Sequence, residues 1–440
     1  EEQQKEVIEQ RIEPEFVEDL MGYVASRVPR DVETGIRVTG NPLMLSMVVS
    51  IFETRVVQIA KMQSIGTAFS NMPVTIAELY QVASSTMLQR VDRKERGAAA
   101  SVAAVPHLRR LLEATFFQAH AAQRRVIDDQ HLEAAALDLH DPSRLAALRW
   151  PSYDGEASAG HYVQVLTGEH TGRFATVTRV NQRGECAVEL EDKKQVAWVR
   201  VKSSGMKKAP FLAEYGDEAR SQKVREAIAA LPIEMKDALN TVRERVAQDR
   251  LPLLTLLQAD PLEMQSSHLS FQEYFAANAI CKGWRLSKAA VAPWQWPVWW
   301  ANALRLGSEM GDEFGRGLLE STGERQVGVD GTSGLEEGRL SLGGCIGGHR
   351  PTSLGATAEM MRAASNIELQ RNRINAEEAR SFVSALKATK TLTVCDMSFN
   401  DLADAGVACL ASALAANKEC PLRVLDLTYN NFRAEGAAVL

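Results

Sequence analysis

Four segments near the C-terminus repeat one short pattern, and this repetition constrains the fold more than any other feature of the chain. The segments span residues 338–347, 365–374, 393–402 and 423–432. Each alternates apolar with other residues and then places an asparagine two positions before an apolar residue, except that Cys345 takes the asparagine position in the first. These positions are separated by 27, 28 and 30 residues. Such spacing predicts one short strand and one helix in each unit.

The pattern resembles the long type of leucine-rich repeat, so we expect a C-terminal α/β solenoid over residues 335–440. The apolar residues should point into its core, the asparagines should bond backbone groups of the turns, and helices at 376–386 and 403–415 should cover the outside. Both ends of the array look uncapped, so more repeats are expected to follow. The concave strand face is a candidate surface for a protein ligand, although a role in solubility alone is the alternative for any single residue. The face offers Glu368, Gln370, Asp396, Ser398, Asp426 and Thr428.

Residues 158–207 interrupt a helical chain with a region of β character. Runs rich in β-branched residues, near 161–166, 173–180, 185–191 and 195–201, are separated by turn signals, which predicts a small closed barrel. The order of valines and glycines resembles a KOW motif of SH3-like barrels, which implies binding to RNA, nucleoprotein or protein. Tiny barrels usually bury their aromatic residues and leave basic loops solvated, so neither kind of contact is required. The motif residues are Val163, Val165, Gly168, Gly172, Val177 and Val180, and the candidate contacts are Arg173, Arg179, Lys193, Lys194 and Trp198.

Helical periodicity dominates the remainder of the chain up to residue 283. Apolar residues at helical spacing predict helices at 7–20, 42–52, 76–88 and 108–119, of which 42–52 should be buried. In "SSHLSFQEYFAA", Ser270 and Glu273 have the spacing of a capping box, which predicts that Ser270 caps a helix. His268 then lies just outside a helix start, where a phosphate contact and a solvated turn residue are the two interpretations.

The segments "TGNPLMLSMVVSIF", "SSHLSFQEYFAA" and "EEQQKEVIEQRI" resemble parts of NACHT-type signal-transducing NTPases, the class that includes NOD-like receptors. The resemblance implies a mainly α multidomain chain: a helical domain (1–72), a winged helix in two parts (73–157 and 208–283) split by the SH3-like barrel, a Trp-rich helical segment with a linker (284–334), and the repeats. It also implies that Pro42, with Gly40 before it, packs on the adenine of ADP. His268 would reach the terminal phosphate of the same nucleotide.

The chain lacks the G-x-x-x-x-G-K-[ST] loop that cradles phosphates, and it offers no recognisable catalytic set. We therefore expect no enzyme activity and no cofactor for this chain alone, with ADP or ATP bound only in a longer protein whose NTPase core also mediates self-oligomerisation. The six cysteines are scattered, which favours a reducing, cytoplasmic setting and no metal site. No apolar run is long enough for a membrane span.

Two functional hypotheses remain open. In the first, the chain is the regulatory and sensor portion of a nucleotide-switched, oligomerising signalling protein, and its repeats recognise a protein. In the second, it is a scaffold without switching, in which the repeats bind protein and the KOW-like barrel binds RNA or the ribosome or transcription machinery. The net charge of −6 excludes a chain that binds polyanions through its overall charge.

Overall fold

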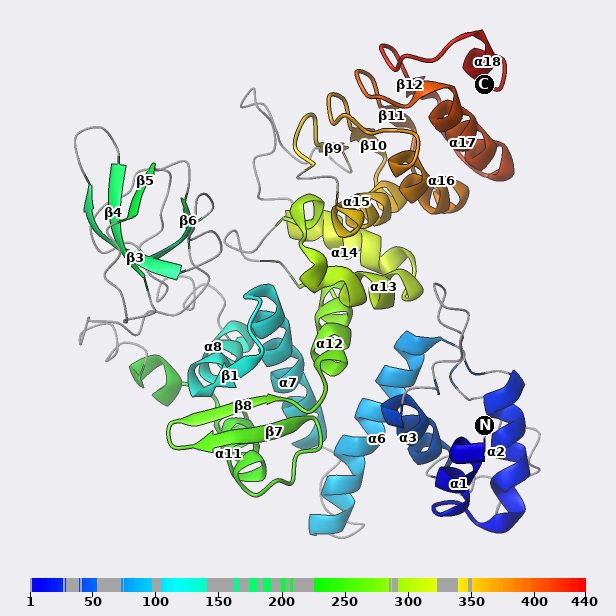
Figure 1. Cartoon of the computed structure of the whole chain (residues 1–440). Helices are drawn as coiled ribbons and strands as arrows, with labels where there is room; N and C mark the ends of the chain where they lie inside the picture. Colours follow the sequence, from blue (N-terminus) through cyan, green and yellow to red (C-terminus); the bar gives the residue numbers. More distant parts are fainter. Residues whose placement is uncertain are drawn as a thin grey trace.

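The computed structural model describes residues 2–26, 28, 39, 42–53, 73, 75–96, 104–140, 225–284, 286, 292–322, 339–346 and 350–440. Between residues 162 and 208 it describes five strands by their backbone alone. The described chain is mainly helical, with three separate sheets (Figure 1). Its two ends lie far apart, the N-terminus beside α1 and the C-terminus beside α18 (Figure 1).

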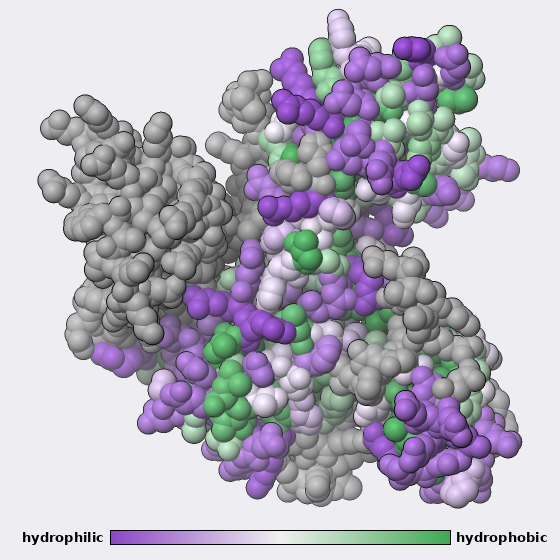
Figure 2. All heavy atoms as spheres, in the orientation of Figure 1, coloured by the Kyte–Doolittle hydropathy of each residue, from purple (hydrophilic) through white to green (hydrophobic). Residues whose placement is uncertain are grey.

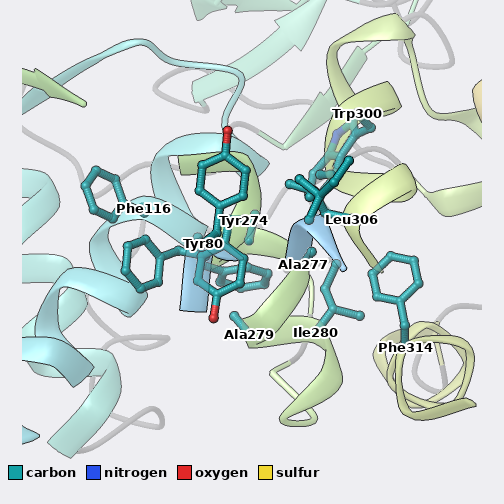
Figure 3. Packing of buried hydrophobic residues seen from close by; sticks show 14 of the residues in the cluster. Tyr80, Phe116, Tyr274, Ala277, Ala279, Ile280, Trp300, Leu306 and Phe314 are labelled. Atoms are coloured by element: carbon teal, nitrogen blue, oxygen red, sulfur yellow. The ribbon is translucent and has the colours of Figure 1, made fainter. Parts of the chain in front are cut away.

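A central helix, α12 (Leu269–Cys281), organises the helical part of the molecule. It packs against α7 (Ala104–Ala121), α13 (Ala301–Glu309) and α14 (Asp312–Thr322). Nearly every side chain from Ser270 to Ile280 is buried, because α12 has neighbours on all sides (Figure 3). Phe275 stacks on Phe116 of α7 with 5.2 Å between ring centroids. A helix that is apolar around most of its circumference must lie inside a protein, and α12 does.

The N-terminal helices are α1 (Glu2–Glu9), α2 (Pro14–Ser26), α3 (Pro42–Ile51) and α6 (Ile76–Arg96). The single helix expected at 7–20 is wrong, because the chain breaks before Pro14, which lacks a backbone N–H and disfavours helix in the residue before it. The buried helix expected at 42–52 is confirmed, since Met47, Val49 and Phe52 are fully buried.

A three-stranded antiparallel sheet lies beside α7, and the sequence reading missed it. It comprises β1 (Val126–Asp128), β7 (Leu254–Ala259) and β8 (Leu262–Ser266), in the order β1-β8-β7. Helices α8 (Asp129–His140) and α11 (Ile233–Ala247) pack with α7 beside it. The strands are short and β7 contains an irregularity after Leu256, so their sequences show no clear alternation. The winged-helix assignment of this region stays a prediction.

The β region predicted between 158 and 207 contains a five-stranded antiparallel sheet. Its strands are β2 (Tyr162–Val165), β3 (Phe174–Val180), β4 (Glu185–Leu190), β5 (Val199–Lys202) and β6 (Met206–Lys208). They pair in the order β5-β4-β3-β2-β6. The β character of this segment is therefore confirmed, whereas its closure into an SH3-like barrel stays a prediction.

The Trp-rich segment joins the helical part to the repeats. It contains the short helices η4 (Pro293–Gln295) and η5 (Val298–Trp300), and the rings of Trp296 and Trp300 stack with 4.1 Å between centroids and are fully buried. The hydroxyls of Thr352 and Ser353, in α15 (Pro351–Ala363), donate to the Trp296 carbonyl over 2.9 and 3.1 Å. Through these contacts the segment packs onto the repeats.

Two glycines let α14 fit between its neighbours. A Cβ on Gly317 would lie 1.9 Å from the Ile280 carbonyl oxygen of α12, and one on Gly315 would lie 2.3 Å from the Glu359 carbonyl oxygen of α15. Both close approaches are to backbone atoms, which cannot move aside cheaply. Helix α14 is thus held tightly between the central helix and the first helix of the repeat region.

The repeat region contains a four-stranded parallel sheet with one strand from each unit. The strands are β9 (Arg339–Ser341), β10 (Asn366–Glu368), β11 (Val394–Asp396) and β12 (Val424–Asp426), in register and in chain order. Helix α17 (Ala403–Ala416) matches the helix expected at 403–415. The helix expected at 376–386 is split into η6 (Glu378–Phe382) and α16 (Val383–Ala388), and α18 (Ala434–Ala437) follows the last strand.

The repeated asparagines form a ladder of buried amides along the sheet. Asn400 Nδ2 donates to the carbonyls of Leu369, Met397 and Ser398, at 2.9–3.2 Å. Its Oδ1 accepts the backbone N–H groups of Asn372 and Ile374, each at 3.0 Å. Asn372 and Asn430 repeat this arrangement in the neighbouring units. The predicted bonding of turn backbone by these side chains is confirmed.

Replacing Asn400 by alanine should destabilise the repeats by at least about 2 kcal/mol, because the change leaves buried backbone donors and acceptors of two units without hydrogen-bond partners. Urea denaturation monitored by circular dichroism measures this loss. Asn431→Gly is the matched control: Asn431 is exposed, and glycine accepts its φ of 57°. That variant should change stability by less than about 0.5 kcal/mol. Equal effects of the two variants would contradict the role assigned to the ladder.

His120 of α7 gives the fold a predictable sensitivity to acid. Its ring is fully buried against Trp299 and Trp300, with centroids 5.1 and 4.4 Å away, and burial lowers its pKa to about 3 from 6.5. Below about pH 6.5 this imidazole binds a proton in the unfolded chain but not in the folded chain. The free energy of unfolding therefore falls as the pH falls.

From about pH 8 to about pH 5, this one group should cost about 2 kcal/mol of unfolding free energy. His120→Leu should flatten the pH dependence by that amount in urea titrations at the two pH values. His140→Leu, at an exposed position at the end of α8, should leave the dependence unchanged. A slope that is identical in the wild type and in His120→Leu would rule out this origin of the acid sensitivity.

Candidate functional site

The strand face of the repeats brings three predicted contact residues into one row. The register aligns Glu368 with Asp396 and Asp396 with Asp426. The Glu368 carboxylate already accepts a hydrogen bond from Arg339 Nε over 3.0 Å, and this pairing partly neutralises that end of the row. The two aspartates, by contrast, carry no ion pair among residues 350–440. The row is therefore most acidic between β11 and β12.

Backbone hydrogen bonds orient the two aspartates. Asp396 Oδ1 accepts the Ser398 N–H over 2.8 Å, and Asp426 Oδ1 accepts the Thr428 N–H over 2.9 Å and the Thr428 hydroxyl over 2.8 Å. Both carboxylates thus lean along their strands toward the turns. Of the other predicted contacts, Thr428 is exposed, Gln370 is half-buried and Ser398 is buried. Ser398 is therefore not an accessible contact in this structure.

A column of three side chains beside this row was not predicted. Arg371, Phe399 and Tyr429 each stand directly before the asparagine of their unit, with φ of 58°, 53° and 57°. The Arg371 guanidinium carbon lies 5.2 Å from the Phe399 ring centroid, and the Phe399 and Tyr429 rings stack with 4.4 Å between centroids. Sequence reasoning considered only the alternating positions; the residue preceding each asparagine was the available signal. We call these three residues the aromatic column.

A second candidate site lies at the start of α12, and its capping differs from expectation. The helix begins at Leu269 with His268 as its N-cap, not Ser270, and His268 Nδ1 accepts the Ser270 N–H over 3.3 Å. The Glu273 carboxylate accepts Asn302 Nδ2 of α13 over 2.5 Å instead of returning to the helix start. The predicted capping box is therefore wrong, because tertiary partners take both of its side chains.

A chain of hydroxyl groups sets the proton position on His268. The Tyr80 hydroxyl donates to Ser270 Oγ over 2.6 Å, and Ser270 Oγ lies 2.5 Å from His268 Nδ1. Burial raises the pKa of Tyr80, partly offset by the Ser270 bond, so this hydroxyl is a donor at neutral pH. Ser270 Oγ keeps its own proton, which it can donate to Nδ1, the nitrogen that also accepts the Ser270 N–H. In the tautomer that this arrangement favours, the imidazole proton is on Nε2, and His268 as a whole is exposed.

The other predicted site residues lie where the structure describes the backbone alone or does not describe the chain. Pro42 is the first residue of α3, where only its backbone is described, and Gly40 lies outside the described residues. Arg179 lies in β3, also described by its backbone alone. The remaining candidates of the insertion, Arg173, Lys193, Lys194 and Trp198, lie outside the described residues.

Within the described part of the chain, no three histidine, cysteine or acidic side chains gather as a metal site would require. A search of the described helices likewise found none that is both long and apolar enough to cross a membrane. The repeat-bearing end of the molecule presents mainly hydrophilic residues on the face shown in Figure 2.

Comparison with known proteins identifies the repeats. A family model described as "Leucine Rich repeat" matches residues 390–411 and 419–440, which contain β11, β12 and the first part of α17. No curated protein matches the chain. The comparisons found nothing that supports the NACHT-type resemblance. Leucine-rich repeats commonly serve as protein-interaction surfaces, and the C-terminal part of this chain carries such repeats.

Ser270→Ala should lower the unfolding free energy by about 1–3 kcal/mol, because it leaves the buried Tyr80 hydroxyl without its acceptor. Thermal and urea denaturation of the purified chain measure the loss. Ser267→Ala, an exposed neighbour, is the matched control and should stay within about 0.5 kcal/mol of the wild type. If both serines tolerate alanine equally, the hydroxyl chain contributes nothing to stability.

Proposed function

We propose that this chain is a protein-recognition module whose repeats bind a protein partner through the strand face. The observation that carries the proposal is the in-register row of Glu368, Asp396 and Asp426, set in a parallel sheet whose turns are held by buried asparagines. A rigid sheet presents side chains at fixed spacing, which lowers the entropic cost of binding. The family match over the last two units supports the same conclusion.

The join between repeats and helices supports a regulatory role for the module. The repeats connect to α12 through α14, whose glycines face backbone atoms of α12 and α15, and α15 also holds the Trp-rich segment through the Trp296 carbonyl. Packed interiors transmit displacement because they are dense. A partner bound at the repeats could thus bias the helical part, which includes His268 at the start of α12.

The recognition surface can be located with a photo-crosslinking amino acid. Placed at the exposed Thr428 on the strand face, it should yield a discrete protein adduct in cells that produce the protein. Placed at the exposed Ser412 on α17, on the helical side, it should not. Both sites lie in the same repeats, so differences in folding or abundance cannot explain a contrast. Equal adducts from both positions, or none from Thr428, would refute recognition through the strand face.

We further propose that, in a longer protein carrying an NTPase core, His268 donates Nε2–H to the terminal phosphate of bound ADP and helps to hold a closed state. The hydroxyl chain from Tyr80 supports this proposal, because it favours the imidazole proton on Nε2 of a histidine that is exposed. The start of a helix also favours an anion nearby. Partner binding at the repeats would release the closed state and permit oligomerisation.

His268→Leu in that longer protein should weaken ADP binding by roughly 10- to 150-fold, the equivalent of one hydrogen bond to a charged group. Isothermal titration with ADP and light scattering measure affinity and oligomeric state. Ser267→Ala should alter neither quantity. Unchanged ADP affinity together with a lower melting temperature would show that His268 is only a structural cap.

A further inference from the structure

The aromatic column exposes two large rings side by side. Phe399 is 45% and Tyr429 is 74% exposed, whereas the nearby pattern residues Met397, Leu402 and Leu427 are buried. The two rings stack on each other within 15° of parallel. Exposed apolar residues are ordinary when single, but a contiguous pair on adjacent repeats forms an apolar patch.

The backbone conformation of the turn does not require aromatic residues at these positions. The position before each asparagine has a positive φ, which glycine adopts most easily and which costs other residues about 1–2 kcal/mol. The first unit has Gly344 there, with φ of 66°. Phe399 and Tyr429 therefore combine an unfavourable backbone conformation with an exposed ring. Strained backbone of this kind is a reason to look for a function at the position.

The charges beside the column favour a cation. Oδ1 of Asp396 and Oδ1 of Asp426 are occupied by backbone N–H groups, and neither Oδ2 has a hydrogen-bond partner among residues 350–440. Adjacent strands lie about 4.8 Å apart, so one guanidinium, with its five donors, can reach both carboxylates. Arg371 shows that a guanidinium packs on these rings, since it lies over Phe399.

The basic residues that the structure describes near the row do not neutralise this pair of carboxylates. Arg339 bonds Glu368 at the other end of the row. Arg371, which belongs to the unit before β11, lies over Phe399. Arg423 precedes β12, and so lies at the end of the strand opposite the turns toward which the aspartates lean. Among the described residues of the repeats, no basic side chain forms an ion pair with Asp396 or Asp426.

We propose that Asp396, Asp426 and the aromatic column form a binding site for an arginine side chain of the partner protein. The guanidinium would bridge the two carboxylates while its aliphatic stem lies along the exposed edges of the Phe399 and Tyr429 rings, because Arg371 and Tyr429 already occupy the faces of Phe399. This inference rests on the proposed recognition through the strand face and names the chemistry of that partner. An acidic or phosphorylated segment is disfavoured at this site by the same two carboxylates.

The probe is a fluorescein-labelled peptide of alternating glycine and arginine, measured by fluorescence anisotropy against the full chain. The same peptide with citrulline in place of arginine keeps the shape and removes the charge. The double variant Asp396→Asn, Asp426→Asn keeps both Oδ1 acceptors and should weaken binding of the arginine peptide about fivefold or more. Glu435→Gln removes one exposed charge from α18, on the helical side, and should leave binding unchanged.

Tyr429→Gly tests the column separately. It relieves the backbone strain and removes the stack, two opposing effects, so the melting temperature should change little while binding weakens about two- to fivefold. The proposal is overturned if the citrulline peptide binds equally well, if the double variant binds like the wild type, or if Glu435→Gln weakens binding as much as the double variant. Any of these results together with a Thr428 crosslink would refute the arginine site and leave recognition through the strand face standing.

Discussion

The repeats depend on three buried amides. Asn372, Asn400 and Asn430 each bond backbone groups of their own unit and of a neighbouring one, so every turn is held by an adjacent unit as well as by itself. Removing buried backbone groups from water without partners would be costly, and the ladder supplies those partners. The same bonds fix the turn that gives the preceding residue its positive φ. The column of Arg371, Phe399 and Tyr429 is thus a consequence of the ladder.

The helical part is organised around α12, and its coupling to the repeats is by close packing. The tryptophan stack packs on α15 through the Trp296 carbonyl, and the two glycines of α14 face backbone atoms of α12 and α15. These contacts bring the backbones of three helices close together, which leaves little freedom for the repeats to move independently. The arrangement suits a module in which binding at one end alters the other.

The repeats could be predicted from the sequence because each unit repeats its chemistry at nearly constant spacing. The role of Asn400 followed from this repetition. The buried segment 42–52 followed from its apolar residues at helical spacing. The break before Pro14 was missed because apolar spacing continued through it, although the proline itself was a signal. The sheet of β1, β7 and β8 was missed because its strands are short and one is irregular.

Site details that depend on tertiary contacts could not be predicted. Ser270 and Glu273 have the spacing of a capping box, yet Tyr80 and Asn302 bind them instead. Neither partner is close in sequence, so local pattern favours the wrong bond. Phe399 and Tyr429 were not predicted as a surface. They occupy equivalent positions in neighbouring units, and such positions form one surface only when the units stack. Ser398 was expected to be accessible, and the same stacking buries it.

Residue-resolved amide hydrogen exchange of the wild-type repeats tests the central claim most directly. The N–H groups of Asn372 and Ile374 bond Asn400 Oδ1, whereas those of Leu369 and Met397 bond backbone carbonyls of the next strand. If the ladder holds the turns, all four should exchange in the same slow class, since only cooperative opening would expose them. Fast exchange at Asn372 and Ile374 beside slow exchange at Leu369 and Met397 would show that the turns open freely. The surface built on them would then not be rigid.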